Sequence, residues 1–388
     1  LGNYLFENPV CKLVGMSGTL YNKTVADFAH LSDWALEEYS PVPRNMRDVN
    51  ALDNLLRGDA NRFEYASFSS WLNGRKARAA LYAQLSQSRG VVITEQETVK
   101  SSLRFNMIKL DIPEELKKAI DACFSEGVVS GLEDYVNLEE SSHLWENVDA
   151  FVLRALAQLT MGCIYFWDWA GKRNDEWLLA RRQWARVVRY LLDAQTELDS
   201  PALIYDHFET LPSDLKREWT YAKDEWAKHR DFKPPPKKTK WINDYFVDAV
   251  CDLVRREQKP VIVWVDLQAV GERISTRLNI PYFGAGAVIP STAVTCVMSI
   301  KAHGTGKNLQ RWDHNIIAHP IADPSIYEQL IARTHRQGQN SDVVTVNAFY
   351  FSVFGSALRR AIKQAHVIED STHQPMRLCY SDKVYVSL

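Results

Sequence analysis

The sequence predicts an α/β protein in which a parallel sheet follows a mainly helical segment. From residue 241 onward, short apolar runs alternate with helix-like stretches, a pattern typical of strands joined by crossover helices. The runs are residues 261–266, 294–300, 315–320 and 343–350, and the helices are residues 241–257, 268–278 and 325–336. Runs that lack polar alternation indicate strands buried on both faces, so we expect helices on both sides of the sheet.

The part of the chain before residue 241 carries weaker patterns. We expect a buried strand at 11–16, a helix at 25–37, an irregular polar stretch at 41–75, a helix at 75–87, strands at 91–94 and 105–112, and a helix opened by Pro113. Residues 143–230 are helical in pattern. The linker 232–240 contains three prolines and four lysines, which favours an extended path.

Composition narrows the class of protein. The chain is 388 residues long, 46% hydrophobic and carries a net charge of −2, so any nucleic-acid site must be a local basic patch. The six cysteines lie far apart without a C-x-x-C pair, which indicates reduced thiols and no local metal site. No apolar run approaches the about twenty residues of a membrane span, and no signal peptide is present, so we expect a cytoplasmic protein without membrane contact.

Many of the twelve tryptophans lie between Trp145 and Trp241. Two interpretations of them remain open, a buried core and a surface on which bases stack. For the lysines of 233–240, a solvated linker is the first interpretation and contact with phosphate is the alternative. The chain also begins without Met at a strand-like segment, which favours a fragment or a split protein.

The stretch "EQLIARTHRQGQN" (328–340) places Gln329, Arg333 and Arg336 at spacings of four and three. On a continuous helix these side chains share one face. Two guanidinium groups on one face favour an anionic ligand, and the alternative is a solvated face with surface ion pairs.

The stretch "SIKAHGTGKNLQ" (299–310) follows a predicted strand. A phosphate-binding P-loop is excluded, because Lys301 stands where its first glycine is needed and Asn308 where Ser or Thr is needed. Gly304 and Gly306 still permit close backbone approach to a ligand. We expect this loop and the arginine segment to open at one edge of the sheet, at the carboxyl ends of its strands.

Together these stretches resemble superfamily-two helicases of the Swi/Snf type. "QLIARTHRQGQ" is similar to their sixth motif, Q-x-x-x-R-x-H-R-x-G-Q, and "SIKAHGTGKNLQ" resembles the fifth. "VIVWVD" occupies the place of the fourth, and "GMSGTLYN" (15–22) resembles the third, with Leu20 in place of the usual proline. "VLRALAQLTMGCIY" resembles a stretch found in phage members of the family.

The chain departs from the family in one large respect. The G-K-T phosphate loop and the D-E-x-H box of the first lobe, which precede the third motif in the family, are absent. The resemblance therefore implies residues 1–112 as a remnant of the first RecA-like lobe, 113–240 as a helical insertion with its linker, 241–370 as the second RecA-like lobe and 371–388 as a tail. Lys307 also replaces a common leucine of the fifth motif.

The resemblance implies an ATP-driven DNA helicase or translocase in which this chain is the back part. Arg333 and Arg336 would be catalytic arginine fingers, and Gln329, Gly304, Gly306 and Asn308 would bind ATP. Ser17, Gly18, Thr19 and Thr305 would contact DNA or couple it to hydrolysis. Magnesium would be held by the missing first-lobe motifs, so the chain alone should be inactive.

The partners implied are DNA and an N-terminal RecA-like lobe, on another chain or on a missing segment. If the chain is phage-encoded, its compartment would be the cytoplasm of the host cell. The alternative is a lobe without catalytic function that binds DNA or a partner protein.

Overall fold

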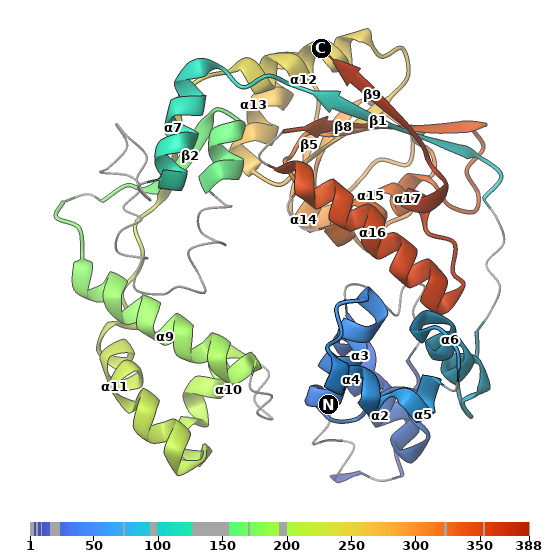
Figure 1. Cartoon of the computed structure of the whole chain (residues 1–388). Helices are drawn as coiled ribbons and strands as arrows, with labels where there is room; N and C mark the ends of the chain where they lie inside the picture. Colours follow the sequence, from blue (N-terminus) through green and yellow to red (C-terminus); the bar gives the residue numbers. More distant parts are fainter. Residues whose placement is uncertain are drawn as a thin grey trace. The chain divides into compact units, whose positions relative to one another are not determined.

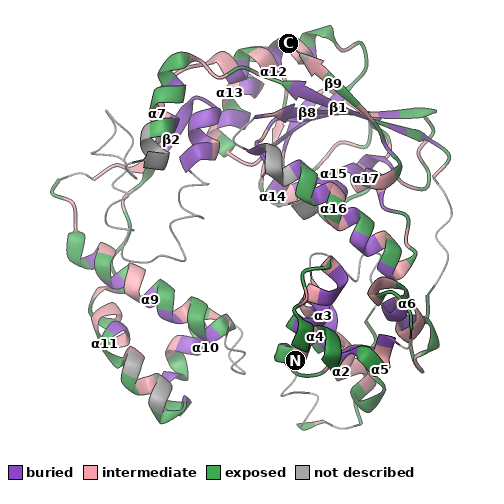
Figure 2. Cartoon of the chain, viewed as in Figure 1, coloured by how far each residue is buried: buried purple, intermediate pink, exposed green. Residues whose placement is uncertain are grey.

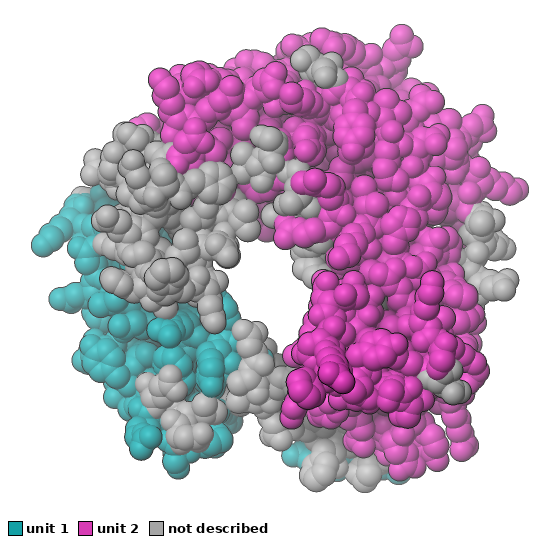
Figure 3. All heavy atoms as spheres, in the orientation of Figure 1, with its two compact units in different colours: residues 1–12, 165–238 teal, residues 13–164, 239–388 magenta. Residues whose placement is uncertain are grey.

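A computed structural model of the chain describes residues 4, 7–8, 10–15, 24–72, 74–93, 99–125, 155–169, 171–193, 200–321, 324–351 and 354–387. The chain forms two compact units, which Figure 3 distinguishes by colour. Unit 1 comprises Leu1–Lys12 and Tyr165–Lys238, and unit 2 comprises Leu13–Ile164 and Thr239–Leu388.

Unit 2 is built on a seven-stranded sheet in the order β5-β6-β4-β7-β8-β1-β9, and every neighbouring pair is parallel. Figure 1 labels β5, β8, β1 and β9 of this sheet. The strands are β1 Ser102–Lys109, β4 Val261–Val265, β5 Tyr282–Phe283, β6 Cys296–Ser299, β7 His314–Ile317, β8 Val343–Tyr350 and β9 Asp382–Ser387. Four of them correspond to the apolar runs after residue 241, so the predicted parallel sheet is confirmed.

Each face of this sheet has its own hydrophobic core, because successive side chains of a strand point to opposite faces. In β4, Ile262 and Trp264 belong to one core, whereas Val261, Val263 and Val265 belong to the other. The first core includes α14 (Ile300–His303), α15 (Pro324–Thr334), α16 (Gly355–Thr372) and α17 (Arg377–Tyr380). The second includes α7 (Glu114–Ser125), α12 (Tyr245–Arg256) and α13 (Gln268–Leu278). Helices therefore cover both faces, as predicted, and Figure 2 shows the buried strands between them.

The segment before β1 is helical. Its elements are α2 Ala26–Leu36, η1 Glu37–Tyr39, α3 Met46–Arg57, α4 Arg62–Ser67, α5 Ser69–Leu72 and α6 Ala77–Gln87. The prediction of an irregular stretch at 41–75 is wrong. Asn45 caps α3, Gly58 ends it with φ 81°, and Asn61 with Glu64 forms a capping box that opens α4. Polar residues that looked like a loop are thus the caps of short helices.

Two predicted strands are also wrong. Residues 11–15 and 91–93, the described parts of these segments, adopt no strand. Val14 is 78% exposed and Val92 is 84% exposed, so neither apolar side chain has a core to enter. Apolar residues in short runs do not form a strand unless a neighbouring strand supplies hydrogen bonds.

The strand β1 lies between β8 and β9, inside the sheet that was expected to begin after residue 240. Leu103, Phe105 and Met107 of β1 enter the first core, and Ile108 enters the second. The expected boundary at residue 112 therefore does not separate two sheets. The predicted tail likewise contributes β9 to this sheet, and the other proposed boundaries remain predictions.

Unit 1 is mainly helical. It contains α9 Asp175–Asp193, α10 Pro201–Asp206, η3 Phe208–Thr210 and α11 Ser213–His229, and the chain enters and leaves it through the paired strands β2 Cys163–Trp167 and β3 Lys237–Trp241. Its core holds Trp184, Val187, Leu191, Ile204, Phe208, Leu211 and Ala222. The helical prediction holds for most of the described part of 143–230 but is wrong at Cys163–Trp167, which form β2, and residues 126–154 lie outside the described residues. The linker leads into β3, with Pro236 O accepting from Asp168 N at 2.9 Å.

Candidate functional site

The two stretches singled out in the sequence lie against each other. Arg333, half-buried near the end of α15, donates from Nε to Gln329 O at 3.0 Å and from Nη1 to Lys307 O at 3.4 Å. In return, Leu309 N donates to Arg333 O at 2.9 Å. These bonds hold the loop after α14 to the end of α15, although the two segments are separated in sequence by a strand.

Arg336 reaches the same loop by a different route from the one predicted. The helix α15 ends at Thr334, so Arg336 does not lie on the helical face of Gln329 and Arg333. Gln339 Nε2 donates to Thr334 O at 3.1 Å and to Trp312 O at 3.0 Å, and Gly338 turns the chain with φ 90°. The chain beyond the helix then brings Arg336 Nη1 into hydrogen-bond contact with Asn308 Oδ1.

The two segments do not both lie at the carboxyl edge of the sheet, as was expected. The loop runs from that edge, where Lys301 pairs with Asp266 after β4 at 3.2 Å, to the amino edge, and the arginine segment approaches the amino edge. The loop after α14 leads into the amino end of β7, and the arginine segment leads into the amino end of β8. Asp313 joins these ends, because Oδ2 accepts from Lys259 Nζ at 2.6 Å and from Ser341 Oγ at 2.6 Å. The prediction failed for the arginine segment because α15 carries the chain from the carboxyl end of β7 back to the amino end of β8 before Arg333 and Arg336 are reached.

The arginines form a centre of positive charge. Burial lowers the pKa of Arg333, and the nearby Arg336 and Arg377 lower it further. Among the described residues, no carboxylate forms an ion pair with Arg333 or Arg336. Two guanidinium groups that lie together without a counter-charge fit an anion with several oxygens, such as a phosphate chain.

The loop 304–308 exposes to solvent most of the residues that were predicted to contact a ligand. Thr305, Gly306 and Asn308 are exposed. Gly306 has φ 69°, a conformation that side chains other than glycine rarely adopt. A Cβ at Gly304 would come within 2.5 Å of Ile300 O, so this position needs glycine for packing against α14.

A buried set of contacts that the sequence did not reveal lies beneath the arginine segment. His335 is completely buried, and its Nε2 lies 2.8 Å from Ser101 O. Arg377 Nε donates to His335 O at 2.9 Å, and the Glu328 carboxyl accepts from Leu378 N at 2.6 Å. Arg377 Nη1 lies 3.9 Å from the other oxygen of Glu328. Glu328 and His335, on either side of Arg333 in sequence, are therefore held by hydrogen bonds from the C-terminal segment. That segment carried no recognisable sequence pattern.

Some predicted features cannot be placed in this site. Ser17, Gly18 and Thr19 lie outside the described residues. Within the described ranges, no group of three or more His, Cys, Asp or Glu side chains is arranged to hold a metal ion. In the same part of the chain, no helix combines the length and apolar character needed to cross a membrane.

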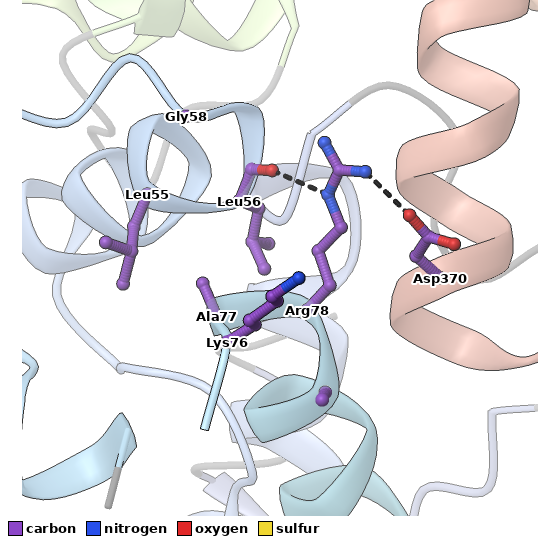
Figure 4. Close-up of a pocket in the computed structure, with 8 residues that line it drawn as sticks. Leu55, Leu56, Gly58, Lys76, Ala77, Arg78 and Asp370 are labelled. Atoms are coloured by element: carbon purple, nitrogen blue, oxygen red, sulfur yellow. Dashed lines mark hydrogen bonds and ion pairs between the residues drawn. The ribbon is translucent and has the colours of Figure 1, made fainter. Parts of the chain in front are cut away.

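A pocket of about 540 Å³ lies between α3, α6 and α16 and contains none of the predicted site residues (Figure 4). Arg78 extends across it, donating from Nε to Leu56 O at 2.9 Å and from Nη1 to Asp370 at 2.7 Å. Its charge is thus already paired, and the pocket offers no comparable anion site.

The chain was compared with protein-family models, curated proteins and solved structures. No family model matches the chain, and no curated protein matches it. Among solved structures, the chain is similar to the crystal structure of the C-terminal part of the Fun30 ATPase domain, with 14% identity and a TM-score of 0.36, over 67% of this chain and 90% of that one.

Proposed function

We propose that this chain is the arginine-bearing part of an ATP-driven DNA helicase or translocase of the Swi/Snf type. The observation that carries the proposal is the convergence of Arg333 and Arg336 on the loop 304–308 without a carboxylate partner among the described residues. The resemblance of both stretches to helicase motifs supports ATP as the anion, because the order of the stretches along the chain agrees with that of the family.

In this proposal Arg333 and Arg336 donate N–H groups to the oxygens of the γ-phosphate and stabilise the charge that develops during its transfer. Arginine fingers of this kind raise the rate by about 10³–10⁵. To reach a phosphate, Arg336 would exchange its bond to Asn308, and Arg333 its bond to Lys307 O. Gln329 would hold Arg333 in place through its carbonyl oxygen.

The remaining predicted residues complete the site. Gly304, Gly306 and Asn308 would approach the nucleotide, and Thr305 would contact a DNA phosphate, with Ser17, Gly18 and Thr19 coupling the two. The residues around the arginines are basic and fit a triphosphate, but they offer no carboxylate cluster for magnesium. We therefore assign magnesium and the phosphate loop to a first RecA-like lobe, on another chain or segment, acting in the cytoplasm of the cell or of a phage host.

The test is Arg336→Ala in the assembly of this chain with its first lobe. We expect kcat to fall by about 10³ or more, because the variant lacks a group that stabilises the transition state. Arg336→Lys should not restore turnover, since an ammonium group cannot bridge two phosphate oxygens as a planar guanidinium does. DNA-stimulated ATP hydrolysis is the measurement, and Arg359→Ala, an exposed arginine on α16, is the matched control. Full turnover by Arg336→Ala would contradict the proposal.

A second function is favoured by one observation, namely that both arginines already hydrogen-bond within the chain. These bonds could serve only to hold the loop 304–308 in a lobe that binds DNA or a partner protein without catalysis. In that case Arg333→Ala and Arg336→Ala would lower the melting temperature, and ATP turnover in any assembly would be independent of both.

A further inference from the structure

Unit 1 gathers aromatic and basic side chains on one part of its surface. Trp167 and Trp169 follow each other at the end of β2, with ring centroids 6.0 Å apart. Trp177 of α9 packs against both, at 5.2 and 6.2 Å. Phe232, at the start of the linker, lies 5.1 Å from Trp177 and 6.3 Å from Trp169. We call these four rings, with Arg181, Lys233 and Lys237, the aromatic–basic face.

The rings differ in their exposure. Trp177 is 2% exposed and forms the buried floor of the cluster, whereas Trp169 is half-buried and Phe232 is 38% exposed. Trp169 and Phe232 are inclined by only 24°, and a centroid distance of 6.3 Å is that of an offset pair. Such an offset leaves part of each ring face uncovered by the other. The uncovered parts of Trp169 and Phe232 are therefore accessible to a flat ligand.

Three of the cations around the rings, Arg181, Lys233 and Lys237, form no ion pair with a carboxylate in the described part of the chain. The Arg181 guanidinium lies 5.0 Å from the ring centroid of Trp167 and 5.3 Å from that of Trp177. Burial lowers the pKa of Arg181, and among the described residues no carboxylate pairs with it. Lys233 is exposed on the linker, and Lys237 is exposed at the start of β3, the strand that pairs with β2. Lys238, by contrast, is neutralised by Asp168 at 2.6 Å.

We propose that the aromatic–basic face binds single-stranded nucleic acid, with bases on Trp169 and Phe232 and phosphates on Arg181, Lys233 and Lys237. Unpaired bases expose ring faces that stack on aromatic side chains, and a flanking row of cations follows the backbone. A duplex hides those faces, and an acidic peptide would satisfy the cations but not the rings. This site is separate from the arginine segment and does not depend on ATP.

The experiment is a titration of the whole chain into a fluorescein-labelled oligothymidylate of about 20 nucleotides, followed by anisotropy at low and moderate salt. Phe232→Ala and Trp169→Ala should each raise the dissociation constant roughly fivefold or more, because one base can no longer stack. Tyr221→Ala, which removes a 66% exposed ring on α11, should leave it unchanged. If Trp169→Ala fails to fold, Phe232→Ala alone decides the stacking step.

The cations are tested by Lys233→Ala with Lys237→Ala. The slope of log affinity against log salt should become shallower by about 0.7 for each phosphate that the variant no longer binds. Lys228→Ala, on α11, is the matched control and should leave the slope unchanged. Arg336→Ala should also bind the oligonucleotide normally, which separates this proposal from the ATP-related one. Equal affinity of the ring variants and the original chain, or equally tight binding of polyglutamate or duplex DNA, would overturn it.

Discussion

Arg377 and Glu328 form the buried pair on which the arginine segment rests. Glu328 is 9% exposed, and burial raises the pKa of its carboxyl, with the Leu378 amide and Arg377 opposing the rise. Arg377 also holds His335 O, the carbonyl between the two arginines of the site. A single residue of the C-terminal segment therefore supports both a buried carboxyl and the backbone that positions Arg336.

We predict that Arg377→Ala destabilises the chain by about 3–5 kcal/mol at neutral pH, because it leaves a buried charge without its partner. The pKa of Glu328 lies above its unfolded value, so ionisation costs stability as pH rises through the folded pKa. The destabilisation should therefore shrink as pH falls toward the ordinary pKa of 4.5. Chemical unfolding at pH 5 and pH 8 measures this. The double variant with Glu328→Gln serves as the control, and an equal loss at both pH values would contradict the pairing.

At the scale of elements, the amino edge of the sheet is joined by one carboxylate. Burial opposes ionisation of Asp313, but hydrogen bonds from Lys259, Ser341 and His314 lower its pKa to about 2. Lys259 precedes β4, Ser341 precedes β8, and His314 is the first residue of β7. The loop and the arginine segment both lead into this edge. The hydrogen bonds of Asp313 therefore help to fix the positions of the site residues.

We predict that Asp313→Asn removes a stability contribution that depends on pH. The folded pKa lies below the ordinary value of 3.8, so the contribution is present above about pH 4 and is lost as pH falls toward 2. The variant should melt at a lower temperature than the original chain at pH 7, and the difference should narrow across that window. Thermal unfolding from pH 7 to pH 2 is the measurement. A difference that stays constant with pH would show that Asp313 contributes only through packing.

At the scale of the whole molecule, the sheet of unit 2 is completed by strands from distant parts of the sequence. β1 precedes the helical segment Tyr165–Lys238 of unit 1 in sequence, and β9 lies near the C-terminal end. The two strands nevertheless pair with each other, and β1 also pairs with β8. The sequence contains no phosphate loop and no D-E-x-H box, so the proposed function requires a separate first lobe to hold the phosphates and magnesium of ATP.

We predict that the purified chain hydrolyses ATP no faster than a buffer control, with or without DNA. Phosphate release measured by a coupled assay is the test, and addition of the proposed first lobe should restore DNA-stimulated turnover. Hydrolysis that copurifies with the chain and disappears in Arg336→Ala would contradict the need for a separate lobe.

The sequence by itself determined the alternation of strands and helices after residue 241 and the identity of the loop and arginine stretches. Those features are visible because burial on both faces leaves continuous apolar runs such as Val261–Val265, and because a motif is a local pattern. Only the tertiary structure decided that β1 enters the sheet, that α15 ends at Thr334, and that Asn308 meets Arg336. The contact between His335 and Ser101 spans 234 positions. Local periodicity reports which residues are buried, but the partner of each buried group is chosen by long-range packing.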